Sequence, residues 1–236
     1  MSKAVFLTGT GTDIGKTYIS GLIVKKLAEA GKNPAYYKAA MSGTDRREDG
    51  REDGSLIPGD ALFVQKTSGI SQPLEEMCPY VYENAWSPHL ASRVEGNPVD
   101  LEVVRKGFLE TADKYDYITM EGSGGILCPL CFDERRIQLE DVIREFELSS
   151  ILVADAGLGT INSVVLTAEY MKARSLPIKG IIFNHYHPGN IMEDDNIFMC
   201  EHMTGLPVIA KVQDNATELE TDADVLAALY DEVKIK

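Results

Sequence analysis

The stretch GTGTDIGKT, residues 9–17, constrains the fold of this chain more than any other. An apolar run at 4–7 precedes it, and apolar residues follow it at helical spacing, at Ile19, Leu22, Ile23 and Leu27. A strand that feeds a glycine-rich loop and then a helix is typical of polyphosphate sites, because the first helical N–H groups point at the anion. Lys16 is placed to reach the outer phosphates and Thr17 to ligate magnesium.

The glycine spacing of this loop is a variant. The strict pattern has four residues between its first glycine and the GK[S/T] triplet, whereas five separate Gly9 from Gly15. A chance GKT in a surface loop is the alternative, and the flanking strand and helix argue against it. The sequence therefore predicts a nucleotide-phosphate loop.

Composition limits the other possibilities. The 236 residues, 44% of them hydrophobic, suffice for one large core, so one domain over 1–236 is expected. A formal charge of −14 leaves no basic stripe for a phosphate backbone, which argues against a nucleic-acid partner. The apolar runs have only strand length and residues 1–8 do not resemble a signal peptide, so no membrane span is expected and the chain is predicted to be cytoplasmic. The four cysteines are then expected to be free thiols.

Apolar runs alternate with helical patterns along the chain, and several runs are continuous, as in strands buried on both faces. The expected fold is α/β, a phosphate-loop-NTPase-like parallel β-sheet flanked by helices on both faces. A charged loop within 44–59, with REDG repeated at 47–50 and 51–54, is predicted to be a solvated insertion. The expected strands are 4–7, 34–38, 115–121, 151–154, 178–183 and 206–210; the expected helices are 16–30, 100–114, 138–147, 162–173 and 221–231, with two more opening near 60 and 88.

Ligands of parallel sheets lie beyond the carboxyl ends of the strands. Glu121 closes one strand and runs into Gly122, Ser123 and Gly124. With Asp60 and Thr17 it forms a set of hard oxygen donors of the kind that magnesium prefers. A capping or surface carboxylate is the alternative for Glu121. A plain helix N-cap is the alternative for Asp60, and the sequence alone favours that alternative.

Two further side chains follow strand ends. Lys38 is directed at the phosphate site, where a lysine can offset charge on a transferring phosphoryl group; a surface lysine is the alternative. Asn184 has an amide that can donate to and accept from the adenine edge, and a turn-initiating asparagine is an equally good interpretation.

Three other features carry less weight. Cys128 and Cys131 have metal-site spacing but no second pair, so zinc is not expected. His185 and His187 stand beside Pro-Gly and indicate a turn rather than a ligand pair. The GLG at 157–159 is too short for a dinucleotide fingerprint, yet it can open a helix whose positive end receives a carboxylate.

Taken together, the motifs resemble the dethiobiotin synthetase family in order along the chain. The family patterns GTDTxVGKT, YKPxxSG, Asp-Ala-Leu, SPH, EGAGG, Pro-Leu and LGxIN are matched at 9–17, 37–43, 60–62, 87–89, 121–125, 129–130 and 158–162. Gly11, Asp13 and Ala39 depart from it, and the family's Pro-containing adenine loop is not found near 212–214, which leaves nucleotide selectivity open.

The resemblance implies an ATP- and Mg²⁺-dependent enzyme that closes a cyclic urea from 7,8-diaminopelargonate and CO2, through a carbamate and a carbamic–phosphoric anhydride. It also implies a homodimer with sites near the subunit interface. Lys38 and Lys16 would be catalytic, Thr17, Asp60 and Glu121 would hold the metal, and Thr12, Ser42 and Asn162 would contact the diamine substrate. ATP would be held by Asp13, Ile14, Gly15, Lys16, Thr17, Tyr18, Glu121, Gly122, Ser123, Gly124 and Asn184.

Three alternatives remain. Partitioning-type switch ATPases carry an extra lysine early in the phosphate loop, and residues 9–15 hold none. Amide-forming ligases of the same fold usually carry a glutamine-hydrolysing domain, for which this chain is expected to be too short. A catalytically idle nucleotide-binding module is the third, and Lys38 with Ser42 argues against it.

Overall fold

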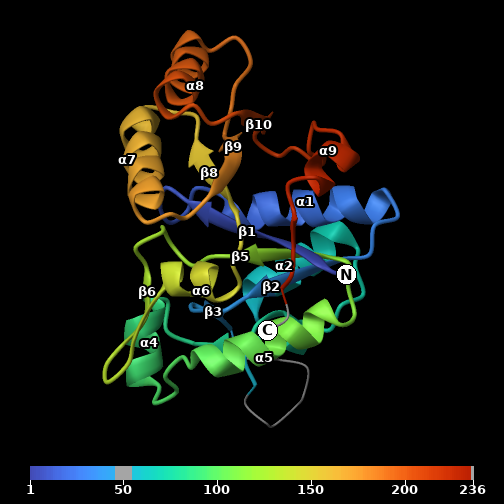
Figure 1. Cartoon of the computed structure of the whole chain (residues 1–236), viewed down its shortest axis with the longest axis vertical. Coiled ribbons are helices and arrows are strands. Elements are labelled where there is room, and N and C mark those ends of the chain that lie inside the picture. Colours follow the sequence, from blue (N-terminus) through green and yellow to red (C-terminus); the bar gives the residue numbers. More distant parts are fainter. Residues whose placement is uncertain (46–54, 235–236) are drawn as a thin grey trace.

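The computed structural model describes residues 1–45 and 55–234. Within them, a seven-stranded sheet has the order β10-β9-β8-β1-β5-β2, and these six strands pair in parallel. The seventh strand, β11, pairs antiparallel with the start of β1. Helices lie on both sides of this sheet (Figure 1), as the sequence predicts. The strands are β1 (Lys3–Gly9), β2 (Pro34–Lys38), β5 (Tyr117–Glu121), β8 (Ser150–Asp155), β9 (Ile178–Asn184), β10 (Val208–Lys211) and β11 (Asp231–Glu232).

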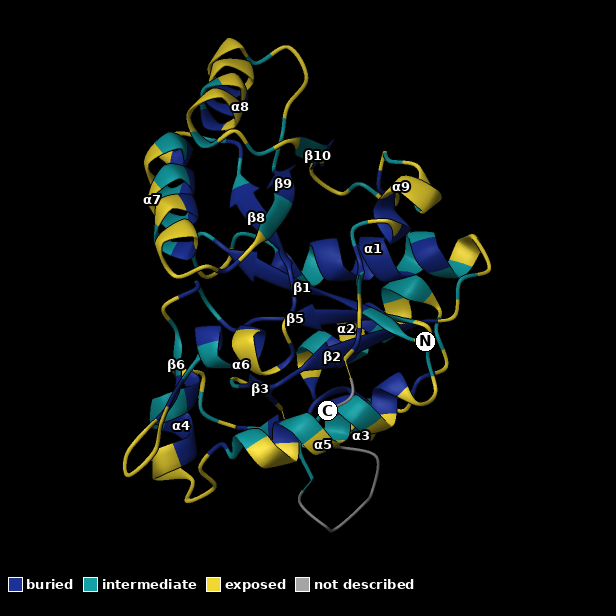
Figure 2. Cartoon of the chain, in the orientation of Figure 1, coloured by how far each residue is buried: buried dark blue, intermediate teal, exposed yellow. Residues whose placement is uncertain are grey.

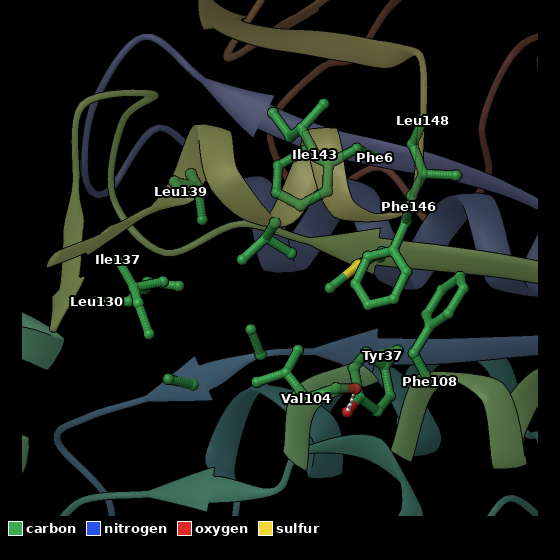
Figure 3. Packing of buried hydrophobic residues seen from close by; sticks show 14 of the residues in the cluster. Phe6, Tyr37, Val104, Phe108, Leu130, Ile137, Leu139, Ile143, Phe146 and Leu148 are labelled. Carbon is green, nitrogen blue, oxygen red and sulfur yellow. Dashed lines mark hydrogen bonds between the residues drawn. The ribbon is translucent and has the colours of Figure 1, made fainter. Parts of the chain in front are cut away.

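The two faces of the sheet bury separate apolar clusters, because successive side chains of a strand point to opposite faces. On one face, Phe6 of β1 and Tyr37 of β2 pack with Phe108 of helix α5 (Leu101–Ala112) and with α6 (Leu139–Glu145), as Figure 3 shows. On the other face, Val5 and Leu7 pack with α1 (Lys16–Glu29) and α9 (Ala223–Ala227). Both faces of β1 are therefore covered, which explains its continuous apolar run.

The remaining elements complete the two layers. Helices α7 (Thr160–Ala173) and α8 (Ile191–Thr204) pack beside β8 and β9, while α2 (Gly59–Ser68) lies against α1. The strands are buried and the outer helix surfaces exposed (Figure 2). The short elements are β3 (Ala40–Met41) paired with β4 (Tyr80–Val81), the hairpin of β6 (Pro129–Phe132) and β7 (Arg136–Gln138), α3 (Leu74–Met77) and α4 (Pro88–Val94).

Three of the differences between the structure and the predicted elements concern α8, the last helix and a hairpin. Helix α8 is absent from the prediction, because only four of its residues are buried and they do not form an apolar stripe. The predicted final helix, 221–231, is wrong beyond Ala227: α9 ends there, and β11 pairs with the first strand instead. The β6–β7 hairpin was also not predicted. The REDG repeats at 47–54 lie outside the described residues.

Strand register brings the candidate residues together. Lys38 is the Cα partner of Glu121, and Glu121 is also the partner of Leu7, two residues before the phosphate loop. The carboxyl ends of β2, β5 and β1 therefore meet at one edge of the sheet. Within the described part of the chain, no helix has the length and apolar character needed to span a membrane.

Candidate active site

The loop between β1 and α1 is tightly wound. Asp13 has a φ of 59° and Gly15, the residue before α1, a φ of 86°. A Cβ atom on Gly15 would lie 2.1 Å from Nδ2 of Asn184, so both the conformation and the close approach require glycine here. The Lys16 ammonium donates to the carbonyl of Gly11 at 2.7 Å and thereby closes the loop on itself. Burial lowers the pKa of Lys16, against a smaller raising effect of Glu121.

A lysine and two carboxylates meet beside this loop. The Lys38 Nζ lies 2.6 Å from Oδ2 of Asp60 and 2.7 Å from Oε1 of Glu121. The Thr17 hydroxyl donates to the same Oε1 at 2.9 Å. Burial opposes the charged form of Lys38, but the two carboxylates outweigh it and raise the pKa of the ammonium above its usual value. The lysine therefore stays protonated, and Thr17, Asp60 and Glu121 lie together as predicted for a metal set.

Glu121 is held by side chains that the sequence did not single out. Its second oxygen, Oε2, accepts from the Ser20 hydroxyl at 2.8 Å and from the Tyr36 hydroxyl at 3.0 Å. Burial first, and then the Glu121 carboxylate, raise the pKa of the Tyr36 phenol, so it remains a hydrogen-bond donor. With both oxygens bonded and 1% of the residue exposed, Glu121 is fixed in position. Its partners sit at buried core positions, where serine and tyrosine look like packing.

These groups line a cavity of about 860 Å³. Eleven of the predicted site residues contribute to its wall: Thr12, Asp13, Gly15, Lys16, Thr17, Lys38, Ser42, Asp60, Glu121, Ser123 and Gly124. Residues that were not predicted complete it, among them Trp86, Ser87 and Cys128. The Ser42 hydroxyl donates to the Trp86 carbonyl at 2.5 Å, which ties the loop after β2 to the segment before α4. The cavity thus runs from the phosphate loop to a second, less charged end.

Five predicted residues do not line this cavity. The Tyr18 hydroxyl donates to the Ala216 carbonyl, and the Ile14 carbonyl accepts from Asn184. Gly122 is packed against Phe6 and Leu139, where a Cβ would come within 3.0 Å of both. The fourth and fifth are Asn184, treated next, and Asn162, which is exposed in the first turn of α7.

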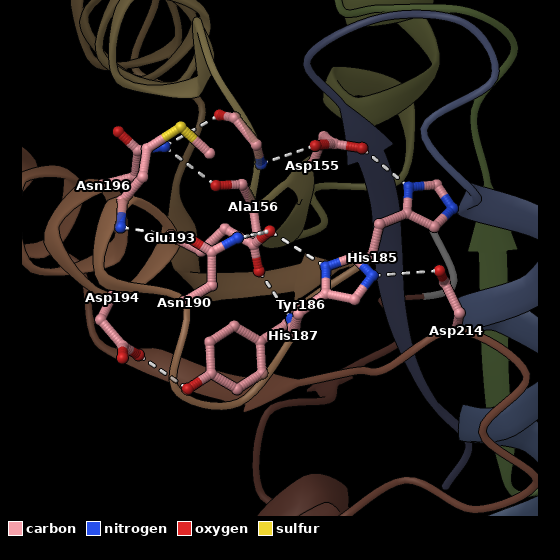
Figure 4. Close-up of polar contacts among 12 residues, drawn as sticks. Asp155, Ala156, His185, Tyr186, His187, Asn190, Glu193, Asp194, Asn196 and Asp214 are labelled. Carbon is pink, nitrogen blue, oxygen red and sulfur yellow. Dashed lines mark hydrogen bonds and ion pairs between the residues drawn. The ribbon is translucent and has the colours of Figure 1, made fainter.

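Asn184 lies at the end of β9, beside the start of α1. Its Nδ2 donates to the Ile14 carbonyl at 3.1 Å and lies 3.1 Å from Nε2 of His185. Nδ1 of that histidine is 2.7 Å from Oδ2 of Asp155 (Figure 4). The predicted contact of this amide with a nucleotide base stays a prediction.

The other sequence features have structural settings of their own. His187 joins Glu193 at 3.0 Å to Asp214 at 3.3 Å, so it connects the turn after β9 with the segment after β10. Cys128 lines the cavity, and Cys131 is buried in the β6–β7 hairpin; both are free thiols. Leu158 and Gly159 do lead into a helix, which begins at Thr160.

Comparison with known proteins shows the family to which the chain belongs. A family model described as an AAA domain matches residues 3–220. The curated ATP-dependent dethiobiotin synthetase of Brachyspira hyodysenteriae is 46% identical over 221 residues, covering 93% of this chain and 96% of the relative, and that of Clostridium perfringens is 47% identical, covering 90% and 91%. Among solved structures, the MinC:MinD cell division complex of Aquifex aeolicus superposes with a TM-score of 0.59 at 13% identity over 100% of this chain and 99% of that one, which shows a shared fold alone. The chain belongs to the ATP-dependent dethiobiotin synthetase family.

Proposed function

We propose that this chain catalyses the ATP-dependent carboxylation and ring closure of 7,8-diaminopelargonate to dethiobiotin. The observation that carries the assignment is the buried Lys38 beside the phosphate loop, paired at 2.6 and 2.7 Å with Asp60 and Glu121. A protonated lysine there suits a reaction that gathers negative charge between a carbamate and a triphosphate. The family relationship supplies the identity of the substrates.

The donor set fits magnesium. The carboxylates of Asp60 and Glu121 hold the Lys38 ammonium, and the Thr17 hydroxyl donates to Glu121, so hard oxygen ligands gather where the protein already accommodates a cation. Thr17, Asp60 and Glu121 would hold the ion. When bound with ATP, it would offset charge on the triphosphate. Ser20 and Tyr36 would keep the Glu121 carboxyl group aligned for that task.

The proposed reaction proceeds in three steps, and Lys16 and Lys38 stabilise the charge that forms in the second. One substrate amine takes up CO2 and loses a proton, which gives a carbamate. A carbamate oxygen then attacks the γ-phosphorus of ATP and ADP leaves, and the ammonium groups of Lys16 and Lys38 stabilise the charge that gathers there. The second amine attacks the anhydride carbon, loses a proton and expels phosphate, which closes the ring. Every bond is made by substrate atoms, so the site needs no nucleophilic side chain.

The family resemblance assigns Thr12 and Ser42 to the substrate, and both line the cavity. Trp86 and Pro129, also in its wall, supply apolar surface for an alkyl chain. Asn162 lies outside the cavity of a single chain, so its predicted contact with the substrate requires a second copy. We therefore propose a homodimer in which the start of α7 of one protomer reaches the cavity of its partner.

The test of the function is phosphate release in the presence of ATP, magnesium and bicarbonate, with and without 7,8-diaminopelargonate, together with a product mass. We expect release that depends on the diamine and a cyclic urea formed in equal amount. Phosphate release at the same rate with and without the diamine would contradict the proposal and favour a switch ATPase.

A further inference from the structure

The hydroxyl of Ser123 joins two loops that line the cavity. It donates to the Ala40 carbonyl at 2.6 Å. Ser123 lies two residues after Glu121, where β5 ends, and Ala40 lies two residues after Lys38, where β2 ends. Both residues are buried, with 8% of Ser123 and 0% of Ala40 exposed. The bond therefore connects the chain that follows Lys38 to the chain that follows Glu121.

This bond lies where the pairing of β2 with β5 ends. Lys38 and Glu121 are the last Cα partners of the two strands. Side chains of a strand repeat every second residue, so Ala40 and Ser123 stand at the next step of the same register. Beyond the last backbone pair, the connection between the two chain segments is thus made by a side chain.

The following residues of the loop after β2 are held by a different part of the molecule. The Met41 carbonyl accepts from the Tyr82 N–H at 2.9 Å. The Ser42 hydroxyl donates to the Trp86 carbonyl at 2.5 Å. Both contacts lead to the segment before α4, so they would carry the loop along if that segment shifted. The Ser123 bond instead ties the loop to the end of β5.

The position of the loop after β2 affects the Lys38 ammonium. Its Nζ lies 2.6 Å from Oδ2 of Asp60, on α2, and 2.7 Å from Oε1 of Glu121, on β5. In the described part of the sheet, β2 is the outermost strand and pairs only with β5. A misplacement of about 1 Å at a reacting group can cost about a hundredfold in rate. A bond that fixes the chain two residues from Lys38 therefore bears on catalysis.

The sequence beside this contact departs from the family patterns at two positions. The patterns YKPxxSG and EGAGG have proline at position 39 and alanine at position 123, whereas this chain has Ala39 and Ser123. A proline fixes one backbone dihedral angle of the turn, and an alanine leaves it free. The Ser123 hydroxyl, which alanine lacks, supplies a constraint on the next residue. The two departures thus lie side by side and oppose each other in effect.

We propose that Ser123 is a positioning residue for Lys38: its hydroxyl holds the loop after β2 against the loop after β5 and thereby keeps the Lys38 ammonium aligned with the reacting groups. The inference rests on the proposed function of Lys38. This role differs from the predicted contact of Ser123 with ATP, because loss of such a contact would lower nucleotide affinity, whereas loss of alignment lowers kcat.

The first experiment measures kcat by diamine-dependent phosphate release and the ADP dissociation constant by calorimetry. Ser123→Ala removes the hydroxyl, and Ser123→Thr keeps it. Ser2→Ala is the matched control, because the Ser2 hydroxyl donates to the Ala112 carbonyl at 2.7 Å, a contact of the same kind at the opposite end of β1. We expect Ser123→Ala to lower kcat by about tenfold and to change the ADP dissociation constant by less than about threefold. Ser123→Thr and Ser2→Ala should keep both values.

A combined variant shows whether Ser123 acts through Lys38. If it does, Lys38→Ala with Ser123→Ala should be as slow as Lys38→Ala alone, to within about twofold. A further tenfold loss of rate in the combined variant would overturn the proposal, as would an unchanged kcat or a tenfold loss of ADP affinity in Ser123→Ala. If the added methyl of Ser123→Thr is not tolerated, the comparison of Ser123→Ala with Ser2→Ala decides.

A labelling experiment needs no turnover. Acetic anhydride acetylates accessible amines, and mass analysis of peptides gives the rate at each lysine. Only 5% of Lys38 is exposed, so slow labelling is expected in the unaltered chain. We expect Lys38 to react at least about threefold faster in Ser123→Ala than in Ser2→Ala, with the other lysines unchanged. Equal rates would overturn the proposal. If the unaltered chain shows no diamine-dependent release, the synthetase assignment fails, and labelling still decides whether Ser123 positions Lys38.

Discussion

The two ends of the nucleotide site solve different problems with different chemistry. At the phosphate end, charged groups saturate one another: Lys38 pairs with two carboxylates, and four donors converge on Glu121. At the end near Asn184, the polar groups are an amide, the His185 ring and the Asp155 carboxylate, and the buried Oδ1 of Asn184 has no donor among the described residues. Charge strong enough to bind and transfer a phosphoryl group must be held rigidly in the free protein, whereas selection of a base requires an atom kept available for it.

Removal of Lys38 should have the largest effect on the phosphate end. Lys38→Ala is expected to lower diamine-dependent kcat by about 10²- to 10³-fold, since removal of a preorganised donor from a developing anion costs about 3–4 kcal/mol. Steady-state phosphate release measures it, with His202→Asn, on the exposed surface of α8, as the control. A loss below tenfold would mean that Lys38 only neutralises the carboxylates.

Gly15→Ala should damage both ends at once. The added methyl carbon would lie 2.1 Å from Nδ2 of Asn184, and the alanine would have to adopt a φ of 86°. We expect ADP affinity to fall by about a hundredfold and the unfolding free energy to drop by about 1–3 kcal/mol. Calorimetry and urea unfolding give the two numbers. For comparison, Gly189→Ala has a φ of 83° with no atom near its Cβ, so it should cost stability and leave affinity unchanged.

A double variant separates the structural role of the Lys38–Glu121 pair from its chemistry. Lys38→Met leaves a carboxylate buried without its cation, and we expect the unfolding free energy to fall by about 3–5 kcal/mol. Lys38→Met combined with Glu121→Gln removes both charges and should recover much of that loss while remaining inactive. Urea unfolding with a parallel activity assay measures this. If the double variant is as unstable as Lys38→Met, uncompensated charge is not the cause.

Tyr36→Phe removes one of the hydrogen bonds that hold Glu121 in position and should have a smaller effect. The change deletes one hydrogen bond to Oε2 in a buried site, and Ser20 retains another. We expect kcat to fall by about tenfold, with little change in ADP affinity, as is usual when a residue that orients a ligand-binding group is altered. A changed ADP affinity at unchanged kcat would assign Tyr36 to binding instead.

The smallest effect concerns pH and the base end. The Glu193 carboxylate first, and Asp214 second, raise the pKa of His187 above its ordinary 6.5. A raised pKa in the folded state means that the folded chain binds more protons than the unfolded chain between the two values. The stabilisation is therefore fully present below pH 6.5 and is lost as the pH rises through the folded pKa. His187→Asn should remove this slope from urea-unfolding curves; a slope that persists would point to another group.

The sequence predicted the residues around Lys38 well and the contacts of Asn184 poorly. Lys38 and Glu121 follow strand ends, and the topology of a parallel sheet brings such residues together whatever the details of packing. Ser20 and Tyr36 were missed because they occupy buried positions where side chains ordinarily only pack. The contacts of the Asn184 amide involve the left-handed turn at His185 and an aspartate from another strand, and no local pattern encodes that meeting.

Helix α8 could have been predicted from the residues that cap its two ends. Asn190 accepts from the Met192 N–H, and its own amide donates to Glu193, three residues on. An asparagine followed by glutamate at that spacing, with Gly205 as the C-cap, marks both helix ends even where the apolar periodicity is weak. The predicted end of the final helix was wrong because of a long-range contact. Its predicted last residue, Asp231, belongs to β11, which pairs with β1 near the start of the chain.

The most direct test of the account follows an oxygen atom. If the carbamate attacks ATP and the ring then closes, one oxygen from CO2 must leave in the phosphate. Brief turnover with ¹⁸O-labelled CO2 in unlabelled water, followed by mass analysis of phosphate, reports this transfer. We expect one labelled oxygen in each phosphate released, in step with formation of the cyclic urea. Phosphate without label at full urea yield would contradict the anhydride route and the role that it gives to Lys38.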